Sequence, residues 1–106
     1  MVGKIEELTP ETFDEFVKND KAVIDFWAPW CGPCKTMGPI FEEASEDLKD
    51  TVKFGKVNVD IGSELAQRYG VMSIPTLMFF RDGQPVDKVV GVLPREDIVK
   101  RAKSIK

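Results

Sequence analysis

The residues of this chain best suited to chemistry are its two cysteines, Cys31 and Cys34, which are separated by a Gly-Pro dipeptide. They follow an apolar segment, residues 22–28, whose Val, Ile, Phe and Trp residues predict a strand. After Cys31 the apolar residues recur at helical spacing, which predicts a helix that begins at this cysteine. Cys34 then lies about one helical turn further on. The two thiols face the same side and can form a reversible dithiol/disulfide pair.

The start of the predicted helix would favour a negatively charged sulfur at Cys31. The first N–H groups of a helix have no intrahelical acceptor, and the aligned peptide dipoles add partial positive charge there. A thiolate at Cys31 would therefore be stabilised, and we expect an accessible nucleophile with Cys34 as its resolving thiol. Gly32 lets the chain pass close to the sulfur, and Pro33 suits the first turn because no N–H is needed there.

Three other interpretations of the cysteine pair are open. Half of a structural zinc site would need further Cys or His ligands, but the chain has no histidine and no third cysteine. A purely structural disulfide would close a very short loop, and short loops gain least from cross-linking. Two unrelated buried thiols are disfavoured by the Gly-Pro dipeptide and by Trp30 directly before Cys31.

Two charged residues stand in segments that otherwise predict strands. Asp25 lies in the middle of the apolar segment, and Lys56 lies in a second predicted strand, residues 51–59. A buried carboxylate is costly unless it is protonated or partnered, so we expect burial to raise the pKa of Asp25. Such a carboxylate would suit a base that works near neutral pH. The alternatives are an Asp25 side chain that points to solvent and a surface Lys56 that extends its ammonium into water.

The composition fits one modest domain over residues 1–106, since 42% of the residues are hydrophobic. The net charge is −3 with both signs spread along the chain, and without a basic stripe we expect no nucleic-acid partner. No segment approaches the roughly 20 apolar residues that span a bilayer, and the N-terminus lacks the apolar core of a signal peptide. We therefore expect a cytoplasmic monomer without membrane contacts, and in that compartment a close Cys pair favours catalytic redox chemistry.

The remaining pattern predicts an α/β fold. Strands 22–28 and 51–59, joined by the helix over 31–48, form a parallel strand-helix-strand unit. Pro39 predicts a kink in that helix, which continues on both sides of it. The other predicted elements are an edge strand over 3–8, a helix from Pro10 to about residue 19, a helix over 63–69 with Ser63 as cap and Gly70 as stop, strands 76–80 and 86–91 joined by an Asp82-Gly83 turn, and a helix that starts at Pro94. We expect a central mixed sheet of four or five strands flanked by helices on both faces.

The segment around the cysteines, Trp-Cys-Gly-Pro-Cys-Lys at 30–35 preceded by Asp-Phe-Trp-Ala-Pro, resembles the active-site segment of the thioredoxin family. The resemblance extends over essentially the whole chain, through Lys56 and Asp60, Ile74-Pro75-Thr76, Asp82-Gly83 and Gly91. It implies a thioredoxin fold and a general protein-disulfide reductase. Oxidising and isomerising relatives usually carry His between the cysteines, whereas Gly-Pro points to a reductant.

The resemblance also implies roles for the other residues. The aspartate that matches Asp25 lies beneath the resolving cysteine and accepts its proton, and Lys56 is similar to its ammonium partner. Pro75 matches the family's cis-proline, which would let the backbone of Ser73 or Ile74 pair with a bound substrate. No bound cofactor is implied beyond the redox-active Cys31–Cys34 disulfide, and a thioredoxin reductase would supply electrons.

We expect the substrate to dock on an apolar surface around Cys31. The residues predicted to form this surface lie near the cysteines and are Trp30, Gly32, Pro33, Ile74, Pro75, Val90, Gly91 and Val92. Ordinary strand packing is the alternative for Val90 and Val92, and Trp27 is predicted to lie in the core. Ser73, where many family members carry Gly, and Met72 would affect the choice of substrate. The acidic run over 42–50 is interpreted as the solvated face of the helix.

Three other functions compete with the reductase. The first is an oxidase or isomerase on the same fold. The second is a redox-independent protein-binding module, in which the apolar surface docks a partner. The third is a metal-delivery protein that uses the two cysteines as soft ligands.

Overall fold

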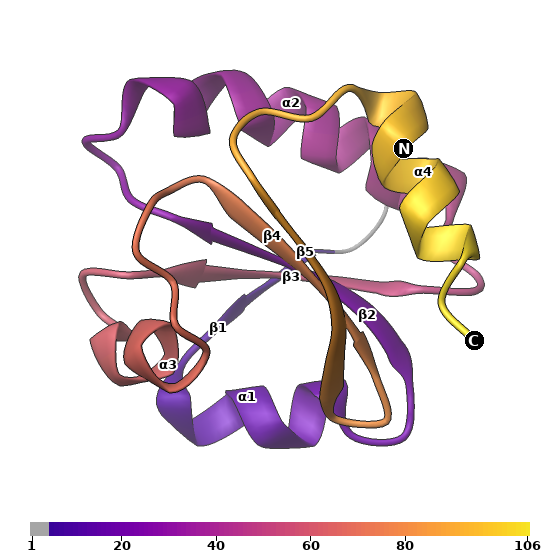
Figure 1. Ribbon diagram of the computed structural model, residues 1–106, viewed down its shortest axis with the longest axis horizontal. Coiled ribbons are helices and arrows are strands. Elements are labelled where there is room, and N and C mark those ends of the chain that lie inside the picture. The colour runs from indigo at the N-terminus through magenta and orange to yellow at the C-terminus, as the bar shows by residue number, and fades with distance from the viewer. Residues whose placement is uncertain (1–4) are drawn as a thin grey trace.

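A five-stranded mixed sheet runs through the molecule and carries helices on both faces (Figure 1). The computed structural model describes residues 5–106. The elements in chain order are β1 (Ile5–Leu8), α1 (Pro10–Val17), β2 (Lys21–Trp27), α2 (Gly32–Asp47), β3 (Lys53–Asn58), α3 (Ser63–Arg68), β4 (Thr76–Arg81), β5 (Gln84–Val90) and α4 (Arg95–Lys103). The predicted α/β architecture is confirmed, with five strands rather than four. Residues 3 and 4 of the predicted edge strand lie outside the described residues.

The strand order β1-β3-β2-β4-β5 places β2 at the centre of the sheet. β2 pairs in parallel with β3, as expected for strands joined by a helix, and antiparallel with β4. β4 and β5 form a hairpin whose Asp82-Gly83 turn has positive φ at both residues, 51° and 83°. This is the backbone geometry that Asp-Gly favours in a two-residue turn. The hairpin register shifts between Phe79 and Phe80.

Each face of the sheet packs against its own pair of helices. α2 and α4 cover one face, and α1 and α3 cover the other (Figure 1). Because side chains alternate along a strand, Val23 of β2 joins the core under α2 and α4, whereas Ile24 and Phe26 join the core under α1 and α3. A strand buried on both faces needs the near-continuous apolar sequence that β2 has.

The helices agree with the expectations except at the start of α3. α2 continues through Pro39, as predicted. α3 begins at Ser63, the residue predicted to cap it, because Gly62 is the N-cap and its carbonyl accepts from the amides of Leu65 and Ala66. The prediction that Ser63 caps this helix is therefore wrong. Gly70, with φ 66°, follows the helix in the left-handed conformation expected of a stop.

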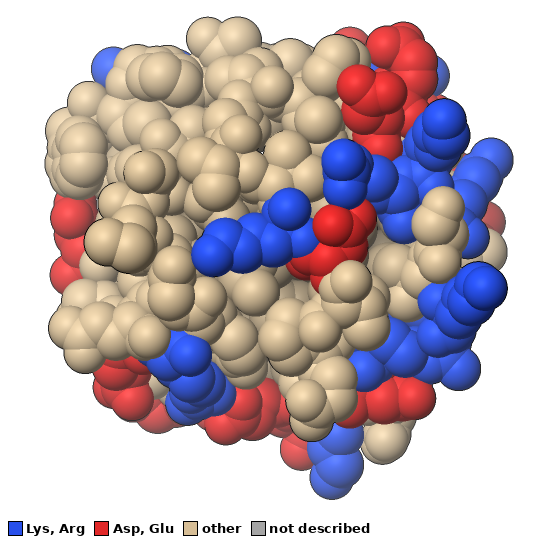
Figure 2. Space-filling view, viewed as in Figure 1, with Lys and Arg blue, Asp and Glu red and all other residues tan. Residues whose placement is uncertain are grey.

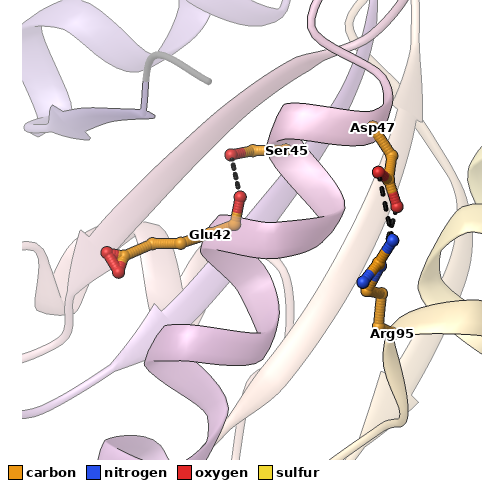
Figure 3. Close-up of polar contacts among 4 residues, drawn as sticks. All are labelled: Glu42, Ser45, Asp47 and Arg95. Carbon is orange, nitrogen blue, oxygen red and sulfur yellow. Dashed lines mark hydrogen bonds and ion pairs between the residues drawn. The ribbon is translucent and has the colours of Figure 1, made fainter. Parts of the chain in front are cut away.

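An ion pair joins the end of α2 to the start of α4 (Figure 3). The Nε and Nη2 atoms of Arg95 donate to the two carboxylate oxygens of Asp47 at 2.8 and 3.3 Å. Nearby on α2, the buried Ser45 hydroxyl donates to the Glu42 carbonyl at 2.6 Å, which satisfies it within its own helix. Glu42, Glu43 and Asp47 are exposed, so this acidic segment forms a solvated helix face, as predicted.

Candidate active site

The two cysteines lie where β2 gives way to α2. Cys31 is the N-cap of α2, with extended backbone (φ −89°, ψ 116°), and its Sγ accepts from the Cys34 amide at 3.2 Å. The two side chains form a disulfide, with Cα atoms 5.3 Å apart. Helix initiation therefore places Cys31 Sγ beside an unpaired helical N–H, which is the arrangement that stabilises a thiolate once the disulfide is reduced.

The cysteines are more recessed than the sequence predicted. Cys31 and Cys34 are each only 5% exposed. They pack with Ala28 and against the partly buried Trp27, Val59 and Ile74, and this contact covers most of both side chains. The expectation of a freely accessible Cys31 is therefore wrong for the disulfide form. Gly32 and Pro33 are exposed, so the pair meets solvent at the tip of the helix.

Asp25 is buried, with 1% of its surface exposed, so the alternative of a solvent-facing side chain is wrong. Burial raises the pKa of its carboxyl from 3.8 to about 7; the charge of Lys56 lowers this pKa and the charge of Glu7 raises it. Desolvation outweighs the attraction of Lys56. Its Oδ1 atom has no hydrogen-bond partner among residues 5–106. The carboxyl can therefore gain or lose a proton near neutral pH.

Lys56 acts on Asp25 through space. The two residues are register partners on β3 and β2, but no ion pair within 4.0 Å joins them in the described part of the chain. The Lys56 ammonium instead lies 4.3 Å from the centroid of the Trp27 ring. Lys56 is therefore an electrostatic neighbour of Asp25 that is held by an aromatic face, and not a direct ion-pair partner.

Trp27 and Glu7 form a contact that the sequence analysis missed. The Trp27 indole N–H donates to Glu7 Oε2 at 3.1 Å. Trp27 is half-buried rather than part of the core, because one face carries the Lys56 ammonium while its edge reaches the outer strand β1. Period-two alternation along residues 5–8 could have indicated Glu7, since it faces Lys56 across the pairing of β1 with β3.

A second loop closes over the disulfide from β4. The Ile74–Pro75 peptide bond is cis, and the Ile74 carbonyl oxygen lies 3.9 Å from Cys31 Sγ. The Gly91 amide donates to the Pro75 carbonyl at 2.8 Å, and the Thr76 hydroxyl donates to the Ser73 carbonyl at 2.6 Å. The carbonyls on either side of Ile74 are therefore engaged within the loop.

Exposed apolar side chains lie around this site. They are Trp30 at 68%, Ile61 at 68%, Met72 at 96%, Val90 at 56% and Val92 at 42% exposure. Pro75, by contrast, is buried and Ile74 half-buried, so neither offers much side-chain surface. The alternative of ordinary burial is wrong for Val90 and Val92, and Ile61 was not foreseen.

Trp30 is held in place by an acidic neighbour. Its indole N–H lies 3.0 and 3.2 Å from the two carboxylate oxygens of Asp60. The face seen in Figure 2 is mostly uncharged over the N-terminal end of α2, whereas Lys and Arg gather over α4. Exposed apolar side chains beside the disulfide form the kind of surface that marks an interaction site.

Within residues 5–106 no group of three or more His, Cys, Asp or Glu side chains is arranged to hold a metal ion. No helix in that range has the length and apolar character needed to cross a membrane.

Comparisons with known proteins agree with this geometry. The family model for Thioredoxin matches residues 4–104. A thioredoxin of Staphylococcus aureus is 46% identical over 96 residues, which cover 91% of this chain and 92% of the relative. A solved thioredoxin of Malassezia sympodialis superposes with a TM-score of 0.87 at 38% identity, covering 95% of this chain and 90% of that one. A mutant thioredoxin from Halobacterium salinarum gives a TM-score of 0.88 at 33% identity, covering 95% and 89%.

Proposed function

The chain belongs to the thioredoxin family and is a thiol-disulfide oxidoreductase that reduces protein disulfides, and we propose the following roles for its residues. Cys31 is the attacking thiolate, Cys34 the resolving thiol, Asp25 the proton acceptor for Cys34, and Lys56 the cation that moderates Asp25. The observation that carries the proposal is the Cys31–Cys34 disulfide at the first turn of α2.

In the first step the Cys31 thiolate attacks one sulfur of a substrate disulfide. The substrate S–S bond breaks, a mixed disulfide forms at Cys31, and the other substrate sulfur leaves as a thiolate that takes a proton from water. The Cys34 amide, 3.2 Å from Cys31 Sγ, and the positive end of α2 favour the attacking thiolate.

In the second step Cys34 resolves the mixed disulfide. Asp25 takes the Cys34 proton, directly or through a water molecule, and the Cys34 thiolate attacks Cys31 Sγ. The Cys31–Cys34 bond forms and the substrate leaves with its second sulfur reduced. Asp25 lies on the same face of β2 as Trp27, which packs with the cysteine pair. Its pKa of about 7 suits a proton acceptor at neutral pH.

The substrate docks on the surface formed by Trp30, Gly32, Pro33, Ile74, Pro75, Val90, Gly91 and Val92. The neighbouring carbonyls are engaged by Gly91 and Thr76, so the backbone of Ile74 is the group beside Cys31 that pairs with a substrate strand. Pro75 contributes by shaping this loop, and Gly91 by fixing it. Ile61 and Met72 extend the apolar area that the substrate meets.

The remaining parts of the proposal concern the source of electrons, the cofactor, the oligomeric state, the partners and the location of the protein. The disulfide formed in the second step must be reduced again, which we assign to a thioredoxin reductase. The protein uses the Cys31–Cys34 disulfide and no other cofactor, works as a one-domain monomer, and binds neither nucleic acid nor membranes. A dithiol that serves as a reductant belongs in the cytoplasm.

The test is to trap the mixed disulfide. Cys34→Ser, reduced and mixed with a disulfide-containing protein, should accumulate a covalent adduct that dithiothreitol releases and that non-reducing electrophoresis detects. Cys31→Ser is the matched control and should give no adduct. Adducts of equal yield in both variants, or in neither, would contradict these roles.

The redox potential separates a reductase from an oxidase. We expect roughly −270 mV, the value reported for thioredoxin itself, from Trp fluorescence in dithiol buffers. A potential near −120 mV would instead indicate an oxidase.

A further inference from the structure

We propose that Glu7 is a positioning residue of the reductase, which sets the pH at which Asp25 accepts the proton of Cys34. This role rests on the function proposed for Asp25. Glu7 would do so as the outer carboxylate of a three-strand charge cluster, Glu7–Lys56–Asp25, that is anchored on the Trp27 indole.

The sheet register brings the cluster together. Lys56 of β3 is the partner of Glu7 on β1 and of Asp25 on β2. Register partners in a parallel sheet project to the same face, so one ammonium is flanked by two carboxyl groups on the face covered by α2. The outer carboxylate belongs to an exposed residue, whereas the inner carboxyl is buried.

The Trp27 side chain contacts both Glu7 and Lys56 and so fixes their positions relative to Asp25. Its N–H donates to Glu7 Oε2 at 3.1 Å, and the Lys56 ammonium lies 4.3 Å from the ring centroid. Trp27 itself packs against the cysteine pair. Glu7 is therefore hydrogen-bonded to a side chain that contacts both Lys56 and the cysteine cluster, which distinguishes it from a freely moving surface carboxylate.

Other groups around Asp25 leave this pair of charges dominant. From β4 its register partner is Leu77. The core on this face receives apolar side chains from α2 and α4, including Met37 and Ile98. In the cluster around the disulfide the ionisable groups are the thiols of Cys31 and Cys34, which are present only after the disulfide has been reduced. Lys56 lowers the pKa of Asp25 and Glu7 raises it. Glu7 thus offsets part of the effect of Lys56 and helps to keep the pKa of the Asp25 carboxyl near 7.

The test removes the charge of Glu7 and keeps its shape. Glu7→Gln still offers an oxygen to the Trp27 N–H. Glu6→Gln is the matched control, because it changes the net charge equally at the neighbouring exposed position, which pairs with Gly55 and projects to the opposite face. The pKa of Asp25 is read from its carboxyl carbon-13 signal in the disulfide form, and the pH dependence of turnover is measured on the same variants.

We expect Glu7→Gln to lower the pKa of Asp25 by about 0.3 units, the effect of one charge two strands away, about 10 Å, in a largely aqueous medium. The acid limb of the turnover profile should move to lower pH by the same amount, and Glu6→Gln should leave both unchanged. No shift in Glu7→Gln, or equal shifts in both variants, would overturn the proposal.

A shifted Asp25 signal with an unshifted turnover profile would also overturn it, because Glu7 would then tune a group that does not limit the reaction. The carboxyl titration needs no turnover, so it separates this result from failure of the proposed function itself, in which the wild-type protein would not reduce disulfides at all.

Discussion

The two faces of the central strand β2 are both buried along most of its length, and they are chemically unlike. Ile24 and Phe26 point toward α1 and α3 into a mainly apolar and aromatic core, in which the uncharged Thr76 is the register partner of Phe26. Val23, Asp25 and Trp27 point toward α2, and along this face the side chains change from aliphatic to charged to hydrogen-bonding as the strand approaches the cysteines. One strand therefore serves stability on one face and, in the function proposed above, proton transfer on the other.

The difference shows how a small domain can hold a costly buried carboxyl. Under α1 and α3, Phe13, Tyr69 and Phe80 form a three-ring cluster with centroids 5.2 to 5.5 Å apart. Tilted and edge-on aromatic contacts of this kind add stability beyond the area they bury. The free energy gained there offsets the desolvation of Asp25 on the opposite side of the same strand.

The largest expected effect breaks the apolar face. Phe80→Ala should destabilise the protein by about 3–5 kcal/mol, because Phe80 is fully buried and contacts both other rings. Urea unfolding measures this loss. The pKa of Asp25 should stay where it is, and a shift in it would contradict the separation of the two faces.

The next effect tests the charged face through pH. The folded protein holds the Asp25 proton up to about pH 7, whereas the unfolded chain releases it near 3.8, so stability falls as the pH rises between these values. Asp25→Asn has no proton to lose. Its stability relative to the wild type should therefore improve by about 4 kcal/mol between pH 4 and pH 8. Denaturation curves at several pH values measure the change, and parallel curves for the two proteins would count against it.

The smallest effect concerns the ion pair between α2 and α4. Asp47→Asn should change the free energy of unfolding by less than about 1 kcal/mol, because the side chains of Asp47 and Arg95 are 35% and 51% exposed. Asp47 also lies at the negative end of α2 and Arg95 at the positive end of α4, so each charge is placed unfavourably with respect to its own helix. Thermal unfolding at low and high salt measures the change. A loss of more than about 2 kcal/mol in the free energy of unfolding would contradict the interpretation of Asp47 and Arg95 as an exposed ion pair of small effect.

Much of the fold could be predicted because its signals are local. The Asp82-Gly83 turn, the Pro10 helix start and the apolar run of β2 each depend on a few neighbouring residues. The cap of α3 was misassigned to Ser63 because a serine signal is local as well, while the choice of Gly62 depends on how β3 delivers the chain into the helix.

The site was only partly predictable, since its finer geometry depends on contacts across the sheet. Burial of Asp25 follows from its apolar neighbours in sequence. The place of Lys56 over Trp27, and the bond from Trp27 to Glu7, join residues about 20 to 30 positions apart. The recessed sulfur of Cys31 likewise depends on Val59 and Ile74, which come from two other segments. The cis bond before Pro75 was predicted from family resemblance alone.

The hairpin that helps to frame the disulfide also decides how the sheet ends. β5 is an open edge with exposed Val86 and Val90, and such an edge can recruit a strand from a second copy of the chain and start aggregation. Pro85 offers no N–H at this edge, it lies beside the register shift at Phe80, and Lys88 adds a charge further along. The opposite edge, β1, covers only four of the residues that the structure describes. The protein can therefore keep exposed apolar side chains next to a free strand without offering copies of itself a regular template for β-sheet growth.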